Sequence, residues 1–143
     1  MQTDVLDHLK SLHTNAVDAR HGYEEALEDA EGRGLSPLFS EMIALHGKHA
    51  AELAALLRGA GQETDDKGSF FSTIHRTIMG IRGLFGGLDE SVLPGLIDGE
   101  KRNLSYYDEA LALPGLPPEV QPVLTAERDA MRAVVTQMER QRK

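Results

Sequence analysis

The sequence has 143 residues, the length of one domain, and its 41% hydrophobic content is enough to form a core. Lys and Arg number 15 against 23 Asp and Glu, so the net charge of −8 opposes binding to nucleic acid or to anionic membranes. Because cysteine is absent, disulfides and thiolate metal ligands are excluded, and a metal could be held only by His, Asp, Glu or Tyr. No apolar run approaches the length of a signal peptide or a membrane span, so we expect a cytoplasmic protein.

Residues 3–31 are predicted to form the first helix, because their apolar side chains recur at steps of three and four. The helix should stop at the glycines that follow it. A second helix should begin almost at once, with Ser36 as its N-cap and Pro37 at its first helical position, and end at Gly61. The two helices should therefore form a tight antiparallel hairpin.

A second hairpin is predicted from residues 90–113 and from a last helix that begins near Pro118, because a short connection joins them. Between the hairpins, residues 69–85 form a shorter amphipathic pattern. This stretch is long enough to cross the length of the bundle, which would give the up-down-down-up topology of an all-α four-helix bundle with a short extra helix in the crossover. The alternative is a five-helix array with the middle helix inside the core.

Glu100 and Glu127 are each the only charged residue in an apolar stripe that advances by steps of three and four. The two stripes are Leu93, Ile97, Glu100, Leu104, Tyr107, Leu111 and Val120, Leu124, Glu127, Met131, Val134, Met138. In the second helix, His46 and His49 interrupt the apolar face in the same way. A buried carboxylate must be paired, hydrogen-bonded, protonated or bound to metal, because an isolated buried charge is too costly.

The heights of these polar residues can be calculated from their distance to the hairpin turns, at 1.5 Å per residue. All lie about 15 to 23 Å from a turn, near the middle of helices about 37 Å long. The set comprises Arg20 and Glu24 in the first helix, His46 and His49 in the second, and Glu100 and Glu127 in the last two. We therefore expect a polar cluster at the middle of the bundle.

Several short motifs follow one another in a familiar order. They are Gly22-Tyr23 with Ala26, then Leu38-Phe39, His49-Ala50-Ala51-Glu52-Leu53 and Gly61, then Tyr107 with Ala110-Leu111, and finally Leu116-Pro117-Pro118-Glu119-Val120. In this order and spacing, over nearly the whole chain, the sequence resembles the ferritin-like superfamily, and most closely its uncharacterised bacterial four-helix-bundle proteins. The resemblance implies a single domain over residues 1–143.

Active ferritin-like di-iron proteins carry one Glu on each of two helices and a Glu-x-x-His pair on each of the other two. Glu100 fits one single carboxylate and Glu24 could serve as the other. Both pairs are missing, since Ala130 stands three residues after Glu127 and Ala44 three residues after Glu41. The remaining set is enough for one metal ion and falls short of a di-iron site.

Two hypotheses follow for the cluster. In the first it is a structural network without catalytic function or required cofactor, in which Arg20 or a protonated His46 or His49 neutralises the carboxylates, and Tyr23 or Tyr107 donates hydrogen bonds. The protein would then act through its surface, as a homodimer or adaptor. In the second, His46, His49, Glu100 and Glu127, with Glu24, bind one iron, manganese or zinc ion for storage or oxidoreductase chemistry.

The remaining histidines and Tyr106 are assigned to the surface or its edge. His8, His13, His21 and His75 have no spacing partner that would make a site, so we expect them on solvated or flanking faces. In the adjacent pair Tyr106-Tyr107, Tyr107 should point inside and Tyr106 should lie at an edge.

Overall fold

The computed structural model describes residues 2–30, 35–64 and 93–141, and these contain four α-helices and no strand. The helices are α1 (Thr3–Ala30), α2 (Ser36–Gly59), α4 (Leu93–Leu111) and α5 (Gln121–Gln141). The predicted all-α four-helix architecture is confirmed. The predicted crossover helix over residues 69–85 lies outside the described residues.

The ends of α2 show how local sequence sets its limits. At the start, Pro37 occupies the first turn, but the N-cap is Leu35 and no side chain caps the helix, so the prediction that Ser36 is the N-cap was wrong by one residue. At the end, Gly61 adopts a φ of 79°, its N–H donates to the carbonyl of Arg58, and the N–H of Gln62 donates to that of Leu57. This pair of bonds is a Schellman motif, and glycine supplies the left-handed conformation that the motif needs.

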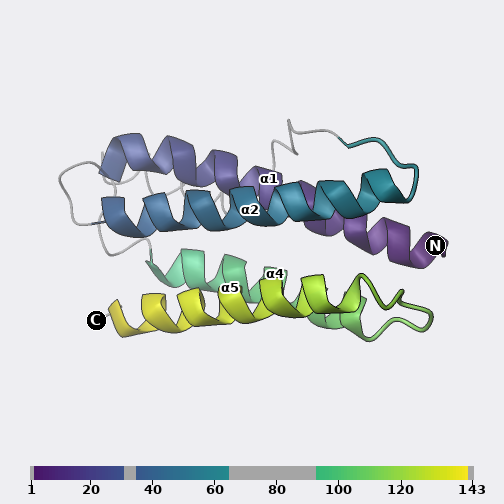
Figure 1. Ribbon diagram of the computed structural model, residues 1–143. Coiled ribbons are helices and arrows are strands. Elements are labelled where there is room, and N and C mark those ends of the chain that lie inside the picture. Colours follow the sequence, from purple (N-terminus) through teal and green to yellow (C-terminus); the bar gives the residue numbers. More distant parts are fainter. Residues whose placement is uncertain (1, 31–34, 65–92, 142–143) are drawn as a thin grey trace.

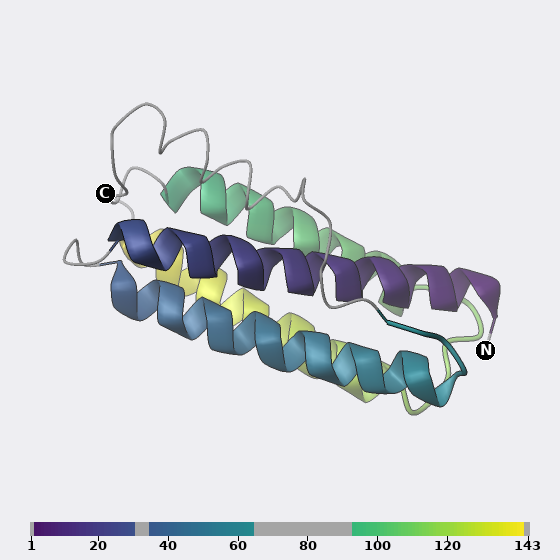
Figure 2. The same cartoon turned by 90° about the horizontal axis from the view of Figure 1, so that it is seen from above.

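The four helices form two antiparallel hairpins that pack face to face, with α1 and α2 in one layer and α4 and α5 in the other (Figure 1). The view from above shows that the helices of both layers run along the same bundle axis (Figure 2). One end of the bundle contains the end of α1, the starts of α2 and α4 and the end of α5. The α4–α5 loop lies at the other end. Because α2 and α4 run in the same direction, the topology is up-down-down-up.

The core consists of two apolar clusters stacked along the bundle axis. The cluster at the α1 C-terminal end includes Tyr23, Phe39, Ile97 and Val134 and comprises side chains from the end of α1, the starts of α2 and α4 and the end of α5. The cluster at the other end joins the opposite halves of the same helices and includes Tyr107. Each cluster joins the helix ends that the up-down-down-up topology brings together, so the clusters support this topology independently.

The most deeply buried polar side chains of the described residues lie near mid-height, where the two clusters meet. They are His46, His49, Glu100 and Glu127, and each is at most 2% exposed. We call these four residues, with the tyrosines Tyr23 and Tyr107, the polar layer. The stripes that predicted their burial are confirmed, and Tyr107 is buried while Tyr106 is exposed, as expected.

Within the described residues, no helix is long and apolar enough to cross a membrane. The helices instead expose charged faces to solvent. Examples are the ion pairs of Lys101 with Glu139 and of Arg128 with Asp108, both between α4 and α5.

Candidate functional site

Glu100 on α4 joins the two hairpins of the bundle. The hydroxyl of Tyr23 on α1 donates a 3.0 Å hydrogen bond to Glu100 Oε1, and Nε2 of His46 on α2 lies 3.0 Å from the same oxygen. A carboxylate oxygen can only accept, so the His46 ring carries its proton on Nε2. Glu100 and His46 are both essentially inaccessible to solvent. Three helices are thus tied together at one carboxylate oxygen.

Aromatic contacts hold the donors of Glu100 in place. The Tyr23 ring stacks on His46 with centroids 5.8 Å apart and an interplanar angle of 10°, and it also packs against Phe39 at 5.6 Å. His49 meets His46 edge-on at 6.3 Å. Burial, and then the charge of Glu100, raises the pKa of Tyr23 well above its usual value of 10.0, so this phenol remains a neutral donor.

Glu127 on α5 has a separate environment. The hydroxyl of Tyr107 on α4 donates a 2.8 Å hydrogen bond to Glu127 Oε1. The pKa of Glu127 is raised from 4.5 to about 9, chiefly by burial. The bond from Tyr107 opposes this shift, and the nearby Glu52 carboxyl on α2 reinforces it. Glu127 is therefore held as a neutral acid at pH 7.

His49 is also neutral at pH 7. Its pKa is lowered from 6.5 to about 4, chiefly by burial and to a smaller extent by the charges of His46 and Lys48. The expectation that a protonated His49 neutralises the carboxylates is therefore wrong. Its buried position beside a second histidine disfavours the imidazolium, whereas His46 contacts the Glu100 carboxylate.

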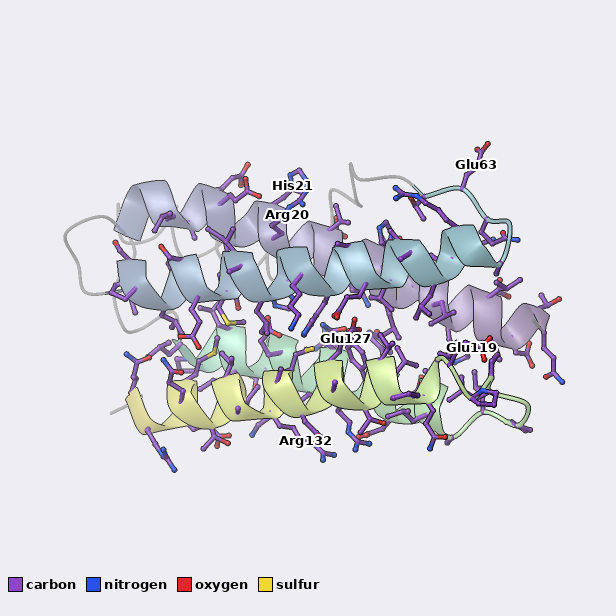
Figure 3. All side chains as sticks on the ribbon, viewed as in Figure 1. Arg20, His21, Glu63, Glu119, Glu127 and Arg132 are labelled. Atoms are coloured by element: carbon purple, nitrogen blue, oxygen red, sulfur yellow. The ribbon has the colours of Figure 1, made fainter. Side chains whose placement is uncertain are left out.

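Arg20 and Glu24 were predicted to join the cluster, and the structure places them on the surface instead. Arg20 Nε lies 3.3 Å from Glu24 Oε1, and the Glu24 side chain is 51% exposed. Figure 3 shows Arg20 projecting from α1 on the side away from α4 and α5, whereas Glu127 lies between the two hairpins. The reason is angular: Arg20 follows the buried Ala19 by one residue, about 100° around the helix, so correct height does not bring it inside.

Four buried atoms of the polar layer have no hydrogen-bond partner within the described part of the chain. They are Nδ1 of His46, Nδ1 of His49, Oε2 of Glu100 and Oε2 of Glu127. Buried polar atoms without partners are rare in folded proteins, so a water, a proton or an ion would have to satisfy them.

The donor set determines which groups the layer could hold. Its imidazole and carboxylate atoms are of the types that bind iron, manganese or zinc. Over residues 2–30, 35–64 and 93–141, however, no three His, Asp or Glu side chains gather closely enough to hold an ion. The arrangement does not fit a di-iron centre, and its acids already accept hydrogen bonds from tyrosines.

Sequence reasoning missed four polar residues. Glu52 and Lys48 act on Glu127 from α2, and the spacing of Glu52, three residues after His49 on the same helix face, could have indicated this. His13 and Asp18 on α1 are 3% and 4% exposed, so the expectation that His13 could be solvated was wrong. Its spacing, four residues after Leu9 and four before Val17, could have indicated its burial.

Comparisons with known proteins identify the family. A family model described as "Domain of unknown function (DUF2383)" matches residues 4–113, which cover α1, α2 and α4 together with all layer residues except Glu127. No curated protein matches the sequence. The chain belongs to the DUF2383 family.

Proposed function

We propose that the polar layer is a structural network that fixes how the two hairpins pair, and that the protein is a non-catalytic member of the ferritin-like superfamily whose di-iron site has degenerated. It acts through its surface, as a homodimer or adaptor. The observation that carries the proposal is that both buried acids are already engaged by the protein itself, Glu100 by Tyr23 and His46, and Glu127 by Tyr107.

The distribution of these bonds supports a role in specifying the fold. Glu100 on α4 binds partners on α1 and α2, so its bonds cross between the hairpins. A hairpin shifted by one helical turn would leave Glu100 and His46 buried without partners, and an unpaired buried charge strongly destabilises a protein. Buried polar groups of this kind can select one register among several apolar packings.

The up-down-down-up topology and the position of Glu100 support the ferritin-like assignment. A single carboxylate at mid-height of the third bundle helix corresponds to the pattern of di-iron bundles. The missing histidine after Glu127 and the absence of Glu24 from the layer support loss of the centre.

One observation favours a second candidate function, the binding of a single divalent ion. Nδ1 of His46, Nδ1 of His49 and Oε2 of Glu100 are buried without partners in the described part of the chain. Two imidazoles and a carboxylate are a ligand set that suits iron or manganese. Side-chain rotation would be needed to bring them together, since they do not form a metal-binding group as they stand.

Metal analysis separates the two candidates. The full chain, purified without an affinity tag, is analysed with and without added Fe(II) or Mn(II), beside the Glu100→Ala, Glu127→Ala double variant. The structural proposal predicts no stoichiometric metal in the wild type and a loss of stability in the double variant. Stoichiometric metal in the wild type, lost in a double variant that still folds, would overturn it and establish the second candidate.

A homodimer is tested separately by sedimentation velocity across a range of protein concentrations. The proposal predicts a dimer of about 31 kDa, twice the chain mass of 15.7 kDa. A monomer at every concentration would reject the dimer and leave an adaptor that binds as a single chain.

A further inference from the structure

A groove between α1 and α4 lies outside the polar layer and has no role in the proposed function. Its volume is about 350 Å³, within the range of small-molecule sites. Six residues line it: Asp7, His8, Ser11 and Asn15 from α1, and Tyr106 and Glu109 from α4. The α1 residues fall at helical spacing on one face, so the groove runs along the helix.

An aromatic ring and two uncompensated carboxylates stand at this groove. Tyr106 is 40% exposed, and no other large hydrophobic side chain of the described residues is exposed. Asp7 and Glu109 form no ion pair within the described part of the chain. The neighbouring Asp108, in contrast, is paired with Arg128 at 3.5 Å and with Arg132 at 3.6 Å.

His8 presents a hydrogen-bond acceptor at the same groove. Its Nδ1 lies 2.8 Å from the carbonyl oxygen of Asp4, and since a carbonyl only accepts, Nδ1 carries the proton. In the neutral ring, Nε2 is then left with its lone pair. The groove is therefore lined by two carboxylates, an imidazole with a lone pair and a phenol ring, all of which attract positively charged donors.

We propose that this groove binds a small organic cation of the amine or guanidinium class. Asp7 and Glu109 accept hydrogen bonds from its charged ends, and Tyr106 contacts its cationic or hydrocarbon part. The net charge of −8 attracts such a cation toward the whole protein, and the aromatic ring restricts it to this position.

The test is a titration of the full chain with spermidine and with arginine ethyl ester at low salt, followed by NMR or calorimetry. Saturable binding with shifts centred on residues of the groove is expected. Tyr106→Ala should weaken binding by about two- to fivefold, since a cation–π contact at an exposed site is of that size. Tyr106→Phe should retain it, and Glu109→Gln should weaken it.

Asp98→Asn is the matched control, because Asp98 is another exposed acid of α4, 11 residues before Glu109. It removes the same charge away from the groove and should leave the affinity nearly unchanged. The proposal is overturned if Asp98→Asn weakens binding as much as Glu109→Gln, if Tyr106→Ala has no effect, or if the titration does not saturate. Each of these results would mean that only the overall negative charge attracts the cation.

Discussion

Tyr107 and Glu127 are joined by a 2.8 Å hydrogen bond between two buried side chains on adjacent helices, and the acid that accepts it is itself protonated at neutral pH. The bond from Tyr107 favours the ionised acid, while burial and the Glu52 carboxyl favour the neutral one. The neutral form prevails because desolvation is the largest of these effects. Glu127 therefore accepts from Tyr107 through Oε1 while it retains its own proton.

The Tyr107→Phe variant tests this bond. It removes the donor and leaves Glu127 Oε1 buried without a partner, so the free energy of unfolding should fall by about 1 to 3 kcal/mol. Urea unfolding at pH 7 measures the change. The neighbouring Tyr106→Phe is the control and should change stability by less than about 0.5 kcal/mol, because Tyr106 is exposed. Equal effects of the two variants would contradict the role of the bond.

The raised pKa of Glu127 predicts that stability falls as the pH rises. In the unfolded chain this acid ionises near 4.5, whereas in the folded chain it holds its proton up to about pH 9. Its contribution is complete below pH 4.5 and is lost between pH 4.5 and 9, by at most about 1.4 kcal/mol per pH unit. His49 changes the stability in the opposite direction, but only below pH 6.5. The fall in the free energy of unfolding should therefore be clearest between pH 6.5 and 9.

Glu127→Gln provides the direct measurement. Glutamine keeps an acceptor for Tyr107 but does not titrate, so this variant should lose the decline between pH 6.5 and 9. At pH 8.5 it should be more stable than the wild type by urea unfolding. The matched exposed substitution Glu119→Gln should keep the wild-type slope. A wild-type slope in Glu127→Gln would show that Glu127 is ionised in the folded protein.

The lowered pKa of His49 predicts a loss of stability in acid. The unfolded chain binds this proton near pH 6.5 and the folded chain only near pH 4, so the contribution is present above 6.5 and is lost as the pH falls to 4. In His49→Gln, the free energy of unfolding should fall less between pH 6.5 and pH 4 than it does in the wild type. His21→Gln, at an exposed position, should leave the curve unchanged. If both variants behave alike, His49 is not neutral in the fold.

The period of the apolar stripes predicted which helix faces are buried, and the rise per residue placed Glu100, Glu127, His46 and His49 at one height. Both arguments use geometry that every α-helix shares, and for this reason they succeeded. Height alone could not decide which side of α1 faces the core, so Arg20 was predicted inside although it stands one residue beyond the buried stripe.

Protonation within the layer could not be predicted from the sequence. The states of Glu127 and His49 depend on burial together with neighbours from other helices, such as Glu52 and Lys48. These neighbours are brought close by tertiary packing and not by spacing along one helix. The sequence therefore predicted that the buried acids would need compensation, and it could not distinguish a counter-charge from a retained proton.

The contact between His46 and Glu100 is best tested by a double-mutant cycle. Each single substitution, His46→Leu or Glu100→Leu, leaves the other group buried without its partner, and should lower the free energy of unfolding by about 3 to 5 kcal/mol. The double variant removes both polar groups and should cost less than the sum of the two, by at least about 1 kcal/mol. Urea unfolding of all four proteins gives the coupling energy.

Tyr23 needs its own control in this cycle, because its hydroxyl also donates to Glu100 Oε1 and loses that acceptor in every Glu100→Leu protein. Repeating the cycle in a Tyr23→Phe background removes this contribution and leaves the coupling of His46 with Glu100 alone. A coupling that persists in this background means that the contact between His46 and Glu100 itself links α2 to α4. A coupling that vanishes there would assign the link between the hairpins to the Tyr23 hydroxyl, and Glu100 would then need only a neutral acceptor, which Glu100→Gln would supply without loss of stability.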